Sequence, residues 1–370
     1  MVDLKGQYSK IKSEIDNAIL DVIDNTEFIN GTAVKNFQKS LEQFLSVKHV
    51  IPCANGTDAL QIAMQALGLK PGDEVITSDF TFIATVEVIA LLGLKPVLAD
   101  VDPDTFLITP EIIEKFITPR TKAIVPVHLF GQCCDMEGIM ALAKKYNLYV
   151  IEDAAQAIGA DFSFSNGIIQ KAGTIGHVGC TSFFPSKNLG CFGDGGALFT
   201  NDDETATMLR SIANHGMKVR YYHDHIGVNS RLDTIQAAIL GVKLKHLNEY
   251  NAARQKAAEF YDKAFQNNSK IQTPKRVKNS DHIFHQYTLV VKSIDRDALK
   301  SYLQERGIPA MVYYPVPMHL QNAYKYLGYK EGEFPVSERL CKTVISLPMH
   351  TELDIDQLNY IVKTIHEFTR

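Results

Sequence analysis

The sequence predicts an α/β protein with a large domain built on a mostly parallel central sheet and a smaller C-terminal α/β domain. Two observations lead to this prediction. Between about residues 50 and 200, short apolar runs alternate with segments of 3.6-residue periodicity, which is typical of βαβ units. A polar stretch over 267–280 follows, and beyond it comes a second, shorter alternation of apolar runs and helical patterns.

The composition fits a folded protein of the soluble kind. Of the 370 residues, 45% are hydrophobic and 22% charged, and 38 Lys and Arg stand against 42 Asp and Glu, for a net charge of -4. Such a chain can bury a sizeable core, and it has no basic excess for nucleic acid. The six cysteines lack disulfide or zinc spacing, the N-terminus is polar, and no apolar run reaches the roughly 20 residues of a membrane span. We therefore expect a cytoplasmic protein with no metal, nucleic-acid or membrane partner.

The large domain accounts for most of the predicted elements. Periodicity predicts strands at Glu74–Thr77, Pro96–Ala99, Ala123–Val127, Tyr149–Glu152, Cys180–Phe184 and Ala197–Thr200. It predicts helices at Ala59–Leu67, Ile83–Leu92, Glu111–Ile117 and Met136–Lys145. Thr109 before Pro110 is a helix start, and Ser230 with Asp233 has capping-box spacing before a long helical pattern that extends to about Phe265.

The C-terminal part repeats the alternation on a smaller scale. We expect strands at Gln286–Val291, Pro309–Tyr313 and Thr343–Leu347, and helices near Arg296–Arg306 and Asp354–Phe368. The resulting organisation is an N-terminal arm over 1–15, a large domain over 16–250, and a linking helix with the small domain over 251–370.

Polar residues at predicted strand ends and helix starts are the candidate site, because ligands of open α/β sheets bind outside the carboxyl ends of the strands. Gly56 and Thr57 open the first predicted helix of the sheet region, where free N–H groups suit a phosphate, although an ordinary helix cap is the alternative. Asp153 ends a buried strand, with Gln156 one turn further on. Capping the next helix is the alternative there.

Lys187 follows the apolar run that begins at Cys180, with Ser182 and Ser186 on either side. An amine in that position can have a lowered pKa and act as a nucleophile, whereas a lone lysine after a strand is usually a surface residue. Phe82 could stack on a flat ligand or belong to the core.

Two further segments carry residues that local structure does not explain. Asn229 and Arg231 flank a serine that a helix cap accounts for, and Tyr313 with Tyr314 could line a cleft or end a strand. Four polar residues could also face the cleft, although structural roles are more common for such residues: His128, Gln132, His215 and His319.

A phosphate cup, a stacking aromatic, a carboxylate and an amine together specify pyridoxal 5'-phosphate. The aldehyde of this cofactor bonds to a lysine, its ring nitrogen needs a carboxylate, and its phosphate needs hydrogen-bond donors. We therefore expect it as the cofactor.

The chain resembles the DegT/DnrJ/EryC1/StrS family of sugar-nucleotide aminotransferases, which have the aspartate aminotransferase (type I) fold. The stretches that carry the resemblance are 55–60, 71–75, 152–156, 182–187, 193–197 and 229–233. The resemblance implies that Lys187 is the Schiff-base and proton-transferring lysine, that Asp153 partners the pyridine nitrogen, and that Gln156 lies beside the ring hydroxyl.

The remaining roles follow from the same resemblance. Phe82 matches the stacking aromatic, and Gly56, Thr57 and Ser182 match the phosphate cup. Asn229 matches a residue that reaches the phosphate of the neighbouring subunit, which implies a homodimer with shared active sites.

The resemblance also implies a substrate pair, L-glutamate and a UDP-linked keto sugar. The expected sugar is a 2-acetamido-2-deoxy-3-oxo-D-glucuronate, aminated for lipopolysaccharide or other surface polysaccharide, with Arg231 clamping its carboxylate and Tyr313 and Tyr314 nearby. The small domain reads Tyr313-Tyr314-Pro315 where that subgroup has His-Tyr-Pro. The alternatives are a 4-keto-6-deoxy sugar nucleotide and, from another class, a regulatory or sensor protein that binds the cofactor without turnover.

Overall fold

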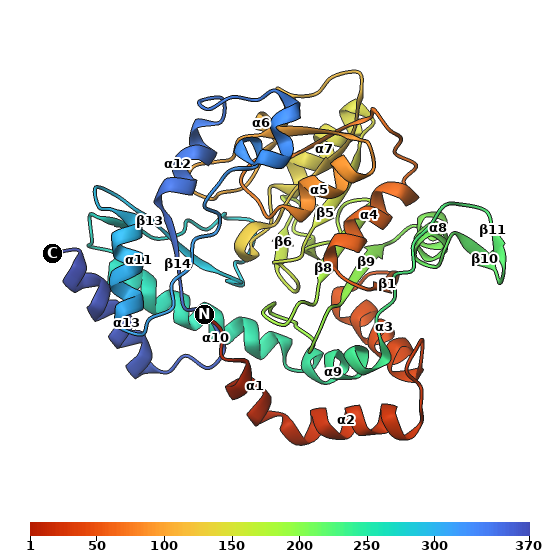
Figure 1. Cartoon of the computed structure of the whole chain (residues 1–370), viewed down its shortest axis with the longest axis horizontal. Helices are drawn as coiled ribbons and strands as arrows, with labels where there is room; N and C mark the ends of the chain where they lie inside the picture. Colours follow the sequence, from red (N-terminus) through yellow and green to blue (C-terminus); the bar gives the residue numbers. More distant parts are fainter.

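The centre of the molecule is a seven-stranded sheet, which the computed structural model of residues 1–370 places between two layers of helices (Figure 1). Its order is β1-β9-β8-β5-β4-β2-β3. The strands β3, β2, β4, β5 and β8 run parallel to one another, and β9 is antiparallel to both of its neighbours. The strands are β1 (His49–Cys53), β2 (Glu74–Ser78), β3 (Lys95–Ala99), β4 (Thr121–Val125), β5 (Tyr149–Asp153), β8 (Val178–Ser182) and β9 (Gly196–Thr200). The predicted mostly parallel α/β sheet is confirmed.

Strand β1 was not predicted from the sequence, and its position explains why. It forms the edge of the sheet, where Pro52 can be accommodated because a proline there costs no ladder hydrogen bond on the solvent side. A strand signal that contains proline is weak in the sequence, although β1 pairs with β9 along its whole length.

The two faces of the sheet are covered by different helices. Alternate residues of β2 show this division, because Val75 packs with α4 (Gly56–Ala66), α5 (Ala84–Leu91) and α8 (Asp203–Ala213), whereas Ile76 packs toward α6 (Pro110–Glu114) and α7 (Met136–Tyr146). Thr109 caps α6 as predicted, with its side chain accepting from the N–H of Ile112.

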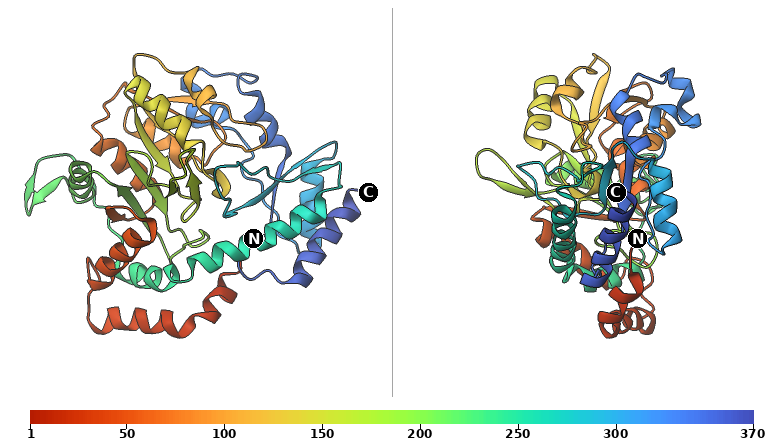
Figure 2. Two further views of the ribbon diagram at one scale, coloured as in Figure 1. Left: turned by 180° about the vertical axis from the view of Figure 1, so that it is seen from behind. Right: turned by 90° about the vertical axis from the view of Figure 1, so that its left-hand side faces the viewer.

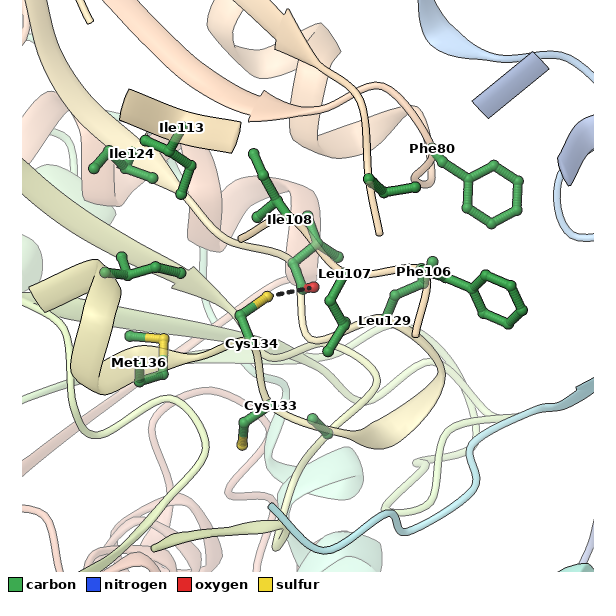
Figure 3. Close-up of a cluster of buried hydrophobic side chains, with 14 of the residues drawn as sticks. Phe80, Phe106, Leu107, Ile108, Ile113, Ile124, Leu129, Cys133, Cys134 and Met136 are labelled. Atoms are coloured by element: carbon green, nitrogen blue, oxygen red, sulfur yellow. Dashed lines mark hydrogen bonds between the residues drawn. The ribbon is translucent and has the colours of Figure 1, made fainter. Parts of the chain in front are cut away.

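The apolar cluster on the α6–α7 side contains three of the six cysteines, Cys133, Cys134 and Cys341. Figure 3 shows Cys133 and Cys134 beside apolar side chains such as Leu129 and Met136. All six cysteines are buried and unpaired, and burial raises the pKa of Cys134 because it disfavours the thiolate. These thiols are core residues.

Helical segments at the N-terminus wrap the β1 end of the sheet. They are α1 (Leu4–Lys10), α2 (Lys12–Asp24) and α3 (Thr32–Leu45), and α9 (Thr234–Leu244) contacts both α2 and α3. The prediction of one long helix to Phe265 is wrong in one respect. A break at Lys245 and His246 separates α9 from α10 (Leu247–Phe265).

The capping box predicted at Ser230 and Asp233 is also wrong. The side chain of Asp233 makes no cap hydrogen bond at α9. The hydroxyl of Ser230 instead donates to Asp58 Oδ2 at 2.6 Å and accepts from the N–H of Ala54 at 3.0 Å. A contact between residues 172 positions apart outcompetes the local motif.

Helix α10 runs from the large sheet to a second, three-stranded sheet (Figures 1 and 2). Leu247 at its start packs in a core cluster with β1, β9 and α3, and Tyr261 near its end packs with the small sheet. The small sheet has the order β12 (Ile271–Gln272), β13 (Tyr287–Val291), β14 (Val344–Leu347), and α11 (Arg296–Glu305) and α13 (Ile355–Phe368) cover it.

The strand predicted at Pro309–Tyr313 does not form. Only Met311 bridges to Ser346, after which the chain leaves the small sheet and lies over the large one. The segment contains η2 (Met318–Leu320), η3 (Asn322–Leu327) and α12 (Pro335–Thr343).

Two hairpins and a short 3-10 turn complete the fold. They are β6 (Asp161–Ser163) with β7 (Ile169–Lys171), β10 (Met217–Val219) with β11 (Tyr222–His223), and η1 (Leu129–Gly131). The β10–β11 hairpin projects from the end of the molecule opposite the small sheet (Figure 1). None of the helices is both long and apolar enough to cross a membrane.

Candidate active site

A cavity of about 770 Å³ opens at the carboxyl ends of the parallel strands, between the large sheet and the segment that leaves the small one. This is where the topology of an open α/β sheet places a ligand. The cavity brings together most residues that the sequence singled out: Gly56, Thr57, Phe82, Asp153, Gln156, Ser182, Lys187, Tyr313 and Tyr314.

Lys187 enters the cavity from the loop after β8. Its amine has no hydrogen-bond or ion-pair partner in the protein, and burial lowers its pKa to about 8, although the negative charge of Asp153 acts in the opposite direction. A neutral amine near pH 8 is a nucleophile and a base, which an ordinary surface lysine is not. The alternative of a plain surface lysine is excluded.

Asp153 is the last residue of β5 and is held in one orientation. Its Oδ2 accepts a hydrogen bond from the Thr85 hydroxyl at 2.7 Å, and its Oδ1 accepts from the N–H of Ala155 at 3.2 Å. Only 7% of the residue is exposed. A buried carboxylate fixed by two donors suits the binding of a protonated ring nitrogen.

The start of α4 forms one end of the cavity. The side chain of Asn55 caps the helix by accepting from the N–H of Asp58 at 2.8 Å, while Gly56 and Thr57 supply first-turn N–H groups that have no intrahelical partner. A Cβ on Gly56 would lie 2.7 Å from Cβ of Ser182, so only glycine allows the helix start to approach β8 this closely. Ser182 adds a hydroxyl to these donors.

Aromatic rings form another wall. The ring of Phe82 is 53% exposed and its centroid lies 6.1 Å from that of Tyr314. Gln156 accepts from the N–H of Phe130 at 2.7 Å and donates to the Tyr314 hydroxyl at 3.1 Å. The amide of Gln156 therefore connects the large sheet to the tyrosine segment.

Asn229 and Arg231 do not line the cavity of their own chain. Asn229 is exposed, and the side chain of Arg231 makes no ion pair or hydrogen bond. Between them, Ser230 is anchored on Asp58 near the start of α4. The pair thus lies at the surface, close to the helix that opens the cavity.

Several lining residues were not identified from the sequence. They include Thr81, Asp194, His285 and Gln286. His285 is buried, and its Nδ1 lies 3.3 Å from Oδ1 of Asn188. Asn188 is the residue that follows Lys187 in the sequence. Nothing local distinguishes this histidine from one in an apolar strand.

The four other polar residues considered from the sequence lie outside the cavity. His128 donates or accepts at 2.8 Å with Glu152, and Gln132 donates to the carbonyl of Lys275 at 3.1 Å. His215 is part of the β10–β11 hairpin base, where its carbonyl contacts His223, and His319 is buried between two carboxylates. These four residues contact other parts of the protein and do not line the cavity.

The donor set fits pyridoxal phosphate. The hydroxyl of Thr81 is buried and has no hydrogen-bond partner, although it faces the cavity, and the amine of Lys187 is likewise unpartnered. The free N–H groups of α4 with the hydroxyls of Thr57 and Ser182 suit a phosphate dianion. Both ends of the cofactor therefore have complementary groups.

The chain matches the model of the DegT/DnrJ/EryC1/StrS aminotransferase family over residues 9–366. It is 48% identical to a protein of Geobacillus stearothermophilus named pleiotropic regulatory protein, over 100% of this chain and 98% of that one. It is 47% identical to the UDP-2-acetamido-2-deoxy-3-oxo-D-glucuronate aminotransferase of Pseudomonas aeruginosa, over 97% of both chains.

A third relative and a solved structure agree with this match. The UDP-N-acetyl-3-dehydro-alpha-D-glucosamine 3-aminotransferase of Acidithiobacillus ferrooxidans is 44% identical over 99% of this chain and 96% of its own. The crystal structure of NtdA from Bacillus subtilis, solved with bound cofactor PMP, superposes with a TM-score of 0.88 at 32% identity, over 97% of this chain and 82% of that one.

Proposed function

The chain belongs to the DegT/DnrJ/EryC1/StrS aminotransferase family, and we propose that it transfers the amino group of L-glutamate to C3 of a UDP-linked 3-oxo sugar. The favoured substrate is UDP-2-acetamido-2-deoxy-3-oxo-D-glucuronate, and the product serves surface polysaccharide such as lipopolysaccharide. The observation that carries the proposal is the unpartnered amine of Lys187, with a pKa near 8, in one cavity with the fixed carboxylate of Asp153.

Pyridoxal phosphate, when bound, supplies an aldehyde that takes up an amino group and a ring that accepts electrons. Lys187 would hold this aldehyde at rest, and its freed amine would serve as the base that moves the proton of the substrate carbon. Asp153, fixed by Thr85, would keep the ring nitrogen protonated. Phe82 would stack on the ring.

The position of the amino group is supported by two relatives. The Pseudomonas aeruginosa and Acidithiobacillus ferrooxidans enzymes are both named for 3-oxo or 3-dehydro UDP sugars, but only the first is named for a glucuronate. C3 amination is therefore the common element, and the carboxylate is the part that this chain must recognise by itself.

Tyr313 and Arg231 are the residues proposed for that recognition. Burial raises the pKa of Tyr313, which keeps its phenol neutral and able to donate a hydrogen bond. Arg231 supplies positive charge, and because it lies outside its own cavity we assign it to the cavity of a partner subunit. Asn229 accompanies it toward the cofactor phosphate.

A homodimer follows from this assignment. The β10–β11 hairpin and the residues just after it support the homodimer, because they expose a group of large apolar side chains to solvent in the single chain: Val219, Tyr221, Tyr222 and Ile226. Apolar groups gathered at one surface mark an interaction site.

A regulatory function without turnover is the second candidate, favoured by the name of the Geobacillus stearothermophilus relative. The two candidates differ in what they need from Lys187. A sensor needs only cofactor binding, whereas an amine with a lowered pKa and free access is needed for proton transfer.

One assay tests the proposal. The holoenzyme is supplied with L-glutamate and UDP-2-acetamido-2-deoxy-3-oxo-D-glucuronate generated in situ, with the 3-dehydro-glucosamine and a 4-keto-6-deoxy UDP sugar in parallel. Formation of 2-oxoglutarate and the 3-amino uronate is expected. Amination of only the 4-keto sugar would show that this sugar, and not the 3-oxo uronate, is the substrate. If the cofactor is bound and none of the three sugars is converted, the regulatory candidate would be favoured.

A further inference from the structure

The segment that carries Tyr313 and Tyr314 packs against the large domain rather than against the small sheet. After Met311 bridges to Ser346, the chain leaves the small sheet. Met318, Tyr324 and Phe334 then pack against Val86 and Leu98 in a separate apolar cluster of the large domain.

Two carboxylates at neighbouring strand ends hold this segment. Asp79 follows β2 and Asp100 follows β3, and these strands are adjacent and parallel. Asp100 accepts from the N–H groups of Val336 and Ser337 at 2.9 and 2.8 Å, so it anchors the start of α12.

Asp79 anchors the part nearer the cavity. Its Oδ2 lies 2.7 Å from His319 Nδ1, its Oδ1 accepts from the N–H of His319 at 2.7 Å, and its carbonyl accepts from the N–H of Met318 at 3.0 Å. His319 Nε2 lies 3.2 Å from Glu338 Oε1, which itself accepts from the N–H of Gly332 at 2.6 Å.

The imidazole of His319 is fully buried between these carboxylates. Burial by itself lowers the pKa of His319, but the hydrogen bonds and charges of Asp79 and Glu338 outweigh it and raise the pKa above the ordinary value. Both ring nitrogens lie within hydrogen-bond distance of a carboxylate oxygen, so a protonated ring can donate to Asp79 and to Glu338 at the same time.

This anchor joins two walls of the active site. Asp79 stands two residues before Thr81 and three before Phe82, which face the cofactor side of the cavity. His319 stands five residues after Tyr314, and two prolines, Pro315 and Pro317, stiffen the intervening chain.

We infer that His319 is a positioning residue for the keto-sugar substrate. Acting through Asp79, it holds the cavity wall formed by Tyr313 and Tyr314, the tyrosine wall, at a fixed distance from Thr81 and Phe82. This inference rests on the proposed function for its substrate. The anchor on Asp79 makes the tyrosine wall part of the large domain. A movement of the small sheet would therefore leave the part of the cavity beside Tyr313 and Tyr314 in place. Asp100 makes no hydrogen bond to His319 and is connected to it only through Glu338 of α12, so Asp100 serves as the control for a less direct perturbation.

The test compares three variants of the holoenzyme: Asp79→Asn, His319→Gln and Asp100→Asn. The first two are expected to raise the KM for the sugar nucleotide about tenfold while kcat and the KM for L-glutamate change less than about twofold. Asp100→Asn is expected to leave the sugar KM within about twofold. Equal effects on both substrates, or an equal effect of Asp100→Asn, would show a general structural role and overturn the inference.

Hydrogen exchange measured by mass spectrometry gives an answer that does not depend on turnover. Residues 311–320 are expected to exchange at least about tenfold faster in Asp79→Asn and His319→Gln, with β13 unchanged. Asp100→Asn is expected to speed exchange in α12 and to change that of 311–320 by less than about threefold, because His319 keeps both contacts with Asp79. Unchanged exchange in 311–320 would also overturn the inference. Lack of sugar turnover by the wild-type enzyme would refute the proposed function instead, and the exchange comparison would still decide the role of His319. Should Asp79→Asn not fold, His319→Gln alone carries both comparisons.

Discussion

Two lysines in this chain have nearly the same pKa and very different surroundings. Burial lowers the pKa of both Lys187 and Lys243 to about 8. Lys243, on α9, is 2% exposed and donates to the carbonyl of Gly190 at 2.6 Å, with the ring of Phe192 5.5 Å away. Lys187 has no partner and borders the cavity. A lowered pKa therefore marks burial, and only free access to a cavity makes the amine available for chemistry.

The largest effect that would test this contrast is on turnover. Lys187→Ala is expected to lower kcat by at least about 10³-fold, because the proton-transferring amine is lost. Lys243→Met, which keeps an unbranched side chain one atom shorter and removes the charge, is expected to change kcat less than about threefold. The measurement is glutamate-dependent formation of 2-oxoglutarate, and comparable losses in both variants would contradict the distinction.

The charge beside Lys187 gives the next effect. Asp153→Asn is expected to lower turnover by about 10²-fold, because a fixed charge is removed from the reacting ring. It is also expected to lower the pKa of Lys187 below about 8, since the negative charge of Asp153 raises that pKa in the wild type.

The pKa part of this prediction is measured on the apoenzyme, by the pH dependence of Lys187 labelling with an amine reagent and mass spectrometry. Lys243 is the internal control, and we expect it to be protected until the protein unfolds. An unchanged or increased labelling midpoint of Lys187 would refute the proposed effect of the Asp153 charge on the pKa of Lys187.

Lys243 is expected to affect stability rather than catalysis. Its folded pKa of about 8 lies below the unfolded value of 10.5, so between these values the unfolded chain holds a proton that the folded chain does not. The contribution of Lys243 to the free energy of unfolding therefore rises with pH between these two pKa values, by roughly 3 kcal/mol over the whole interval. The difference in unfolding free energy between wild type and Lys243→Met is expected to grow in favour of wild type from pH 7.5 to 9.5, and a pH-independent difference would contradict it.

The smallest effect concerns the hydroxyl that orients Asp153. Thr85→Val keeps the shape of the side chain and removes the 2.7 Å hydrogen bond, so turnover is expected to fall roughly 3- to 10-fold. Thr77→Val is the matched control, because the Thr77 hydroxyl donates to the carbonyl of Val125 in the core of the sheet. Equal kcat values for the two variants would show that the Thr85 hydroxyl does not act through Asp153.

The sequence was informative where chemistry lies within one strand and the turn that follows it. Lys187 and Asp153 could be identified because Asp153 ends a buried strand and Lys187 lies in the loop after one, and both border the cavity. The pairing of Asp79 with His319 could not, because the two are 240 residues apart and neither sits in a local motif. Ser230 is the opposite case, in which a local motif gave a wrong prediction. The spacing of Ser230 and Asp233 is that of a capping box, but the Ser230 hydroxyl donates to Asp58 instead.

Helix α10 has a consequence for how the molecule melts. Leu247 at one end belongs to the apolar cluster under the large sheet, and Tyr261 near the other belongs to the cluster under the small sheet. Midway, the buried guanidinium of Arg254 donates to the carbonyls of Phe284, His285 and Met349. Neither sheet can lose its core without disrupting this shared rod, so calorimetry should record one cooperative transition, with a van't Hoff enthalpy close to the measured one, in a chain long enough for two.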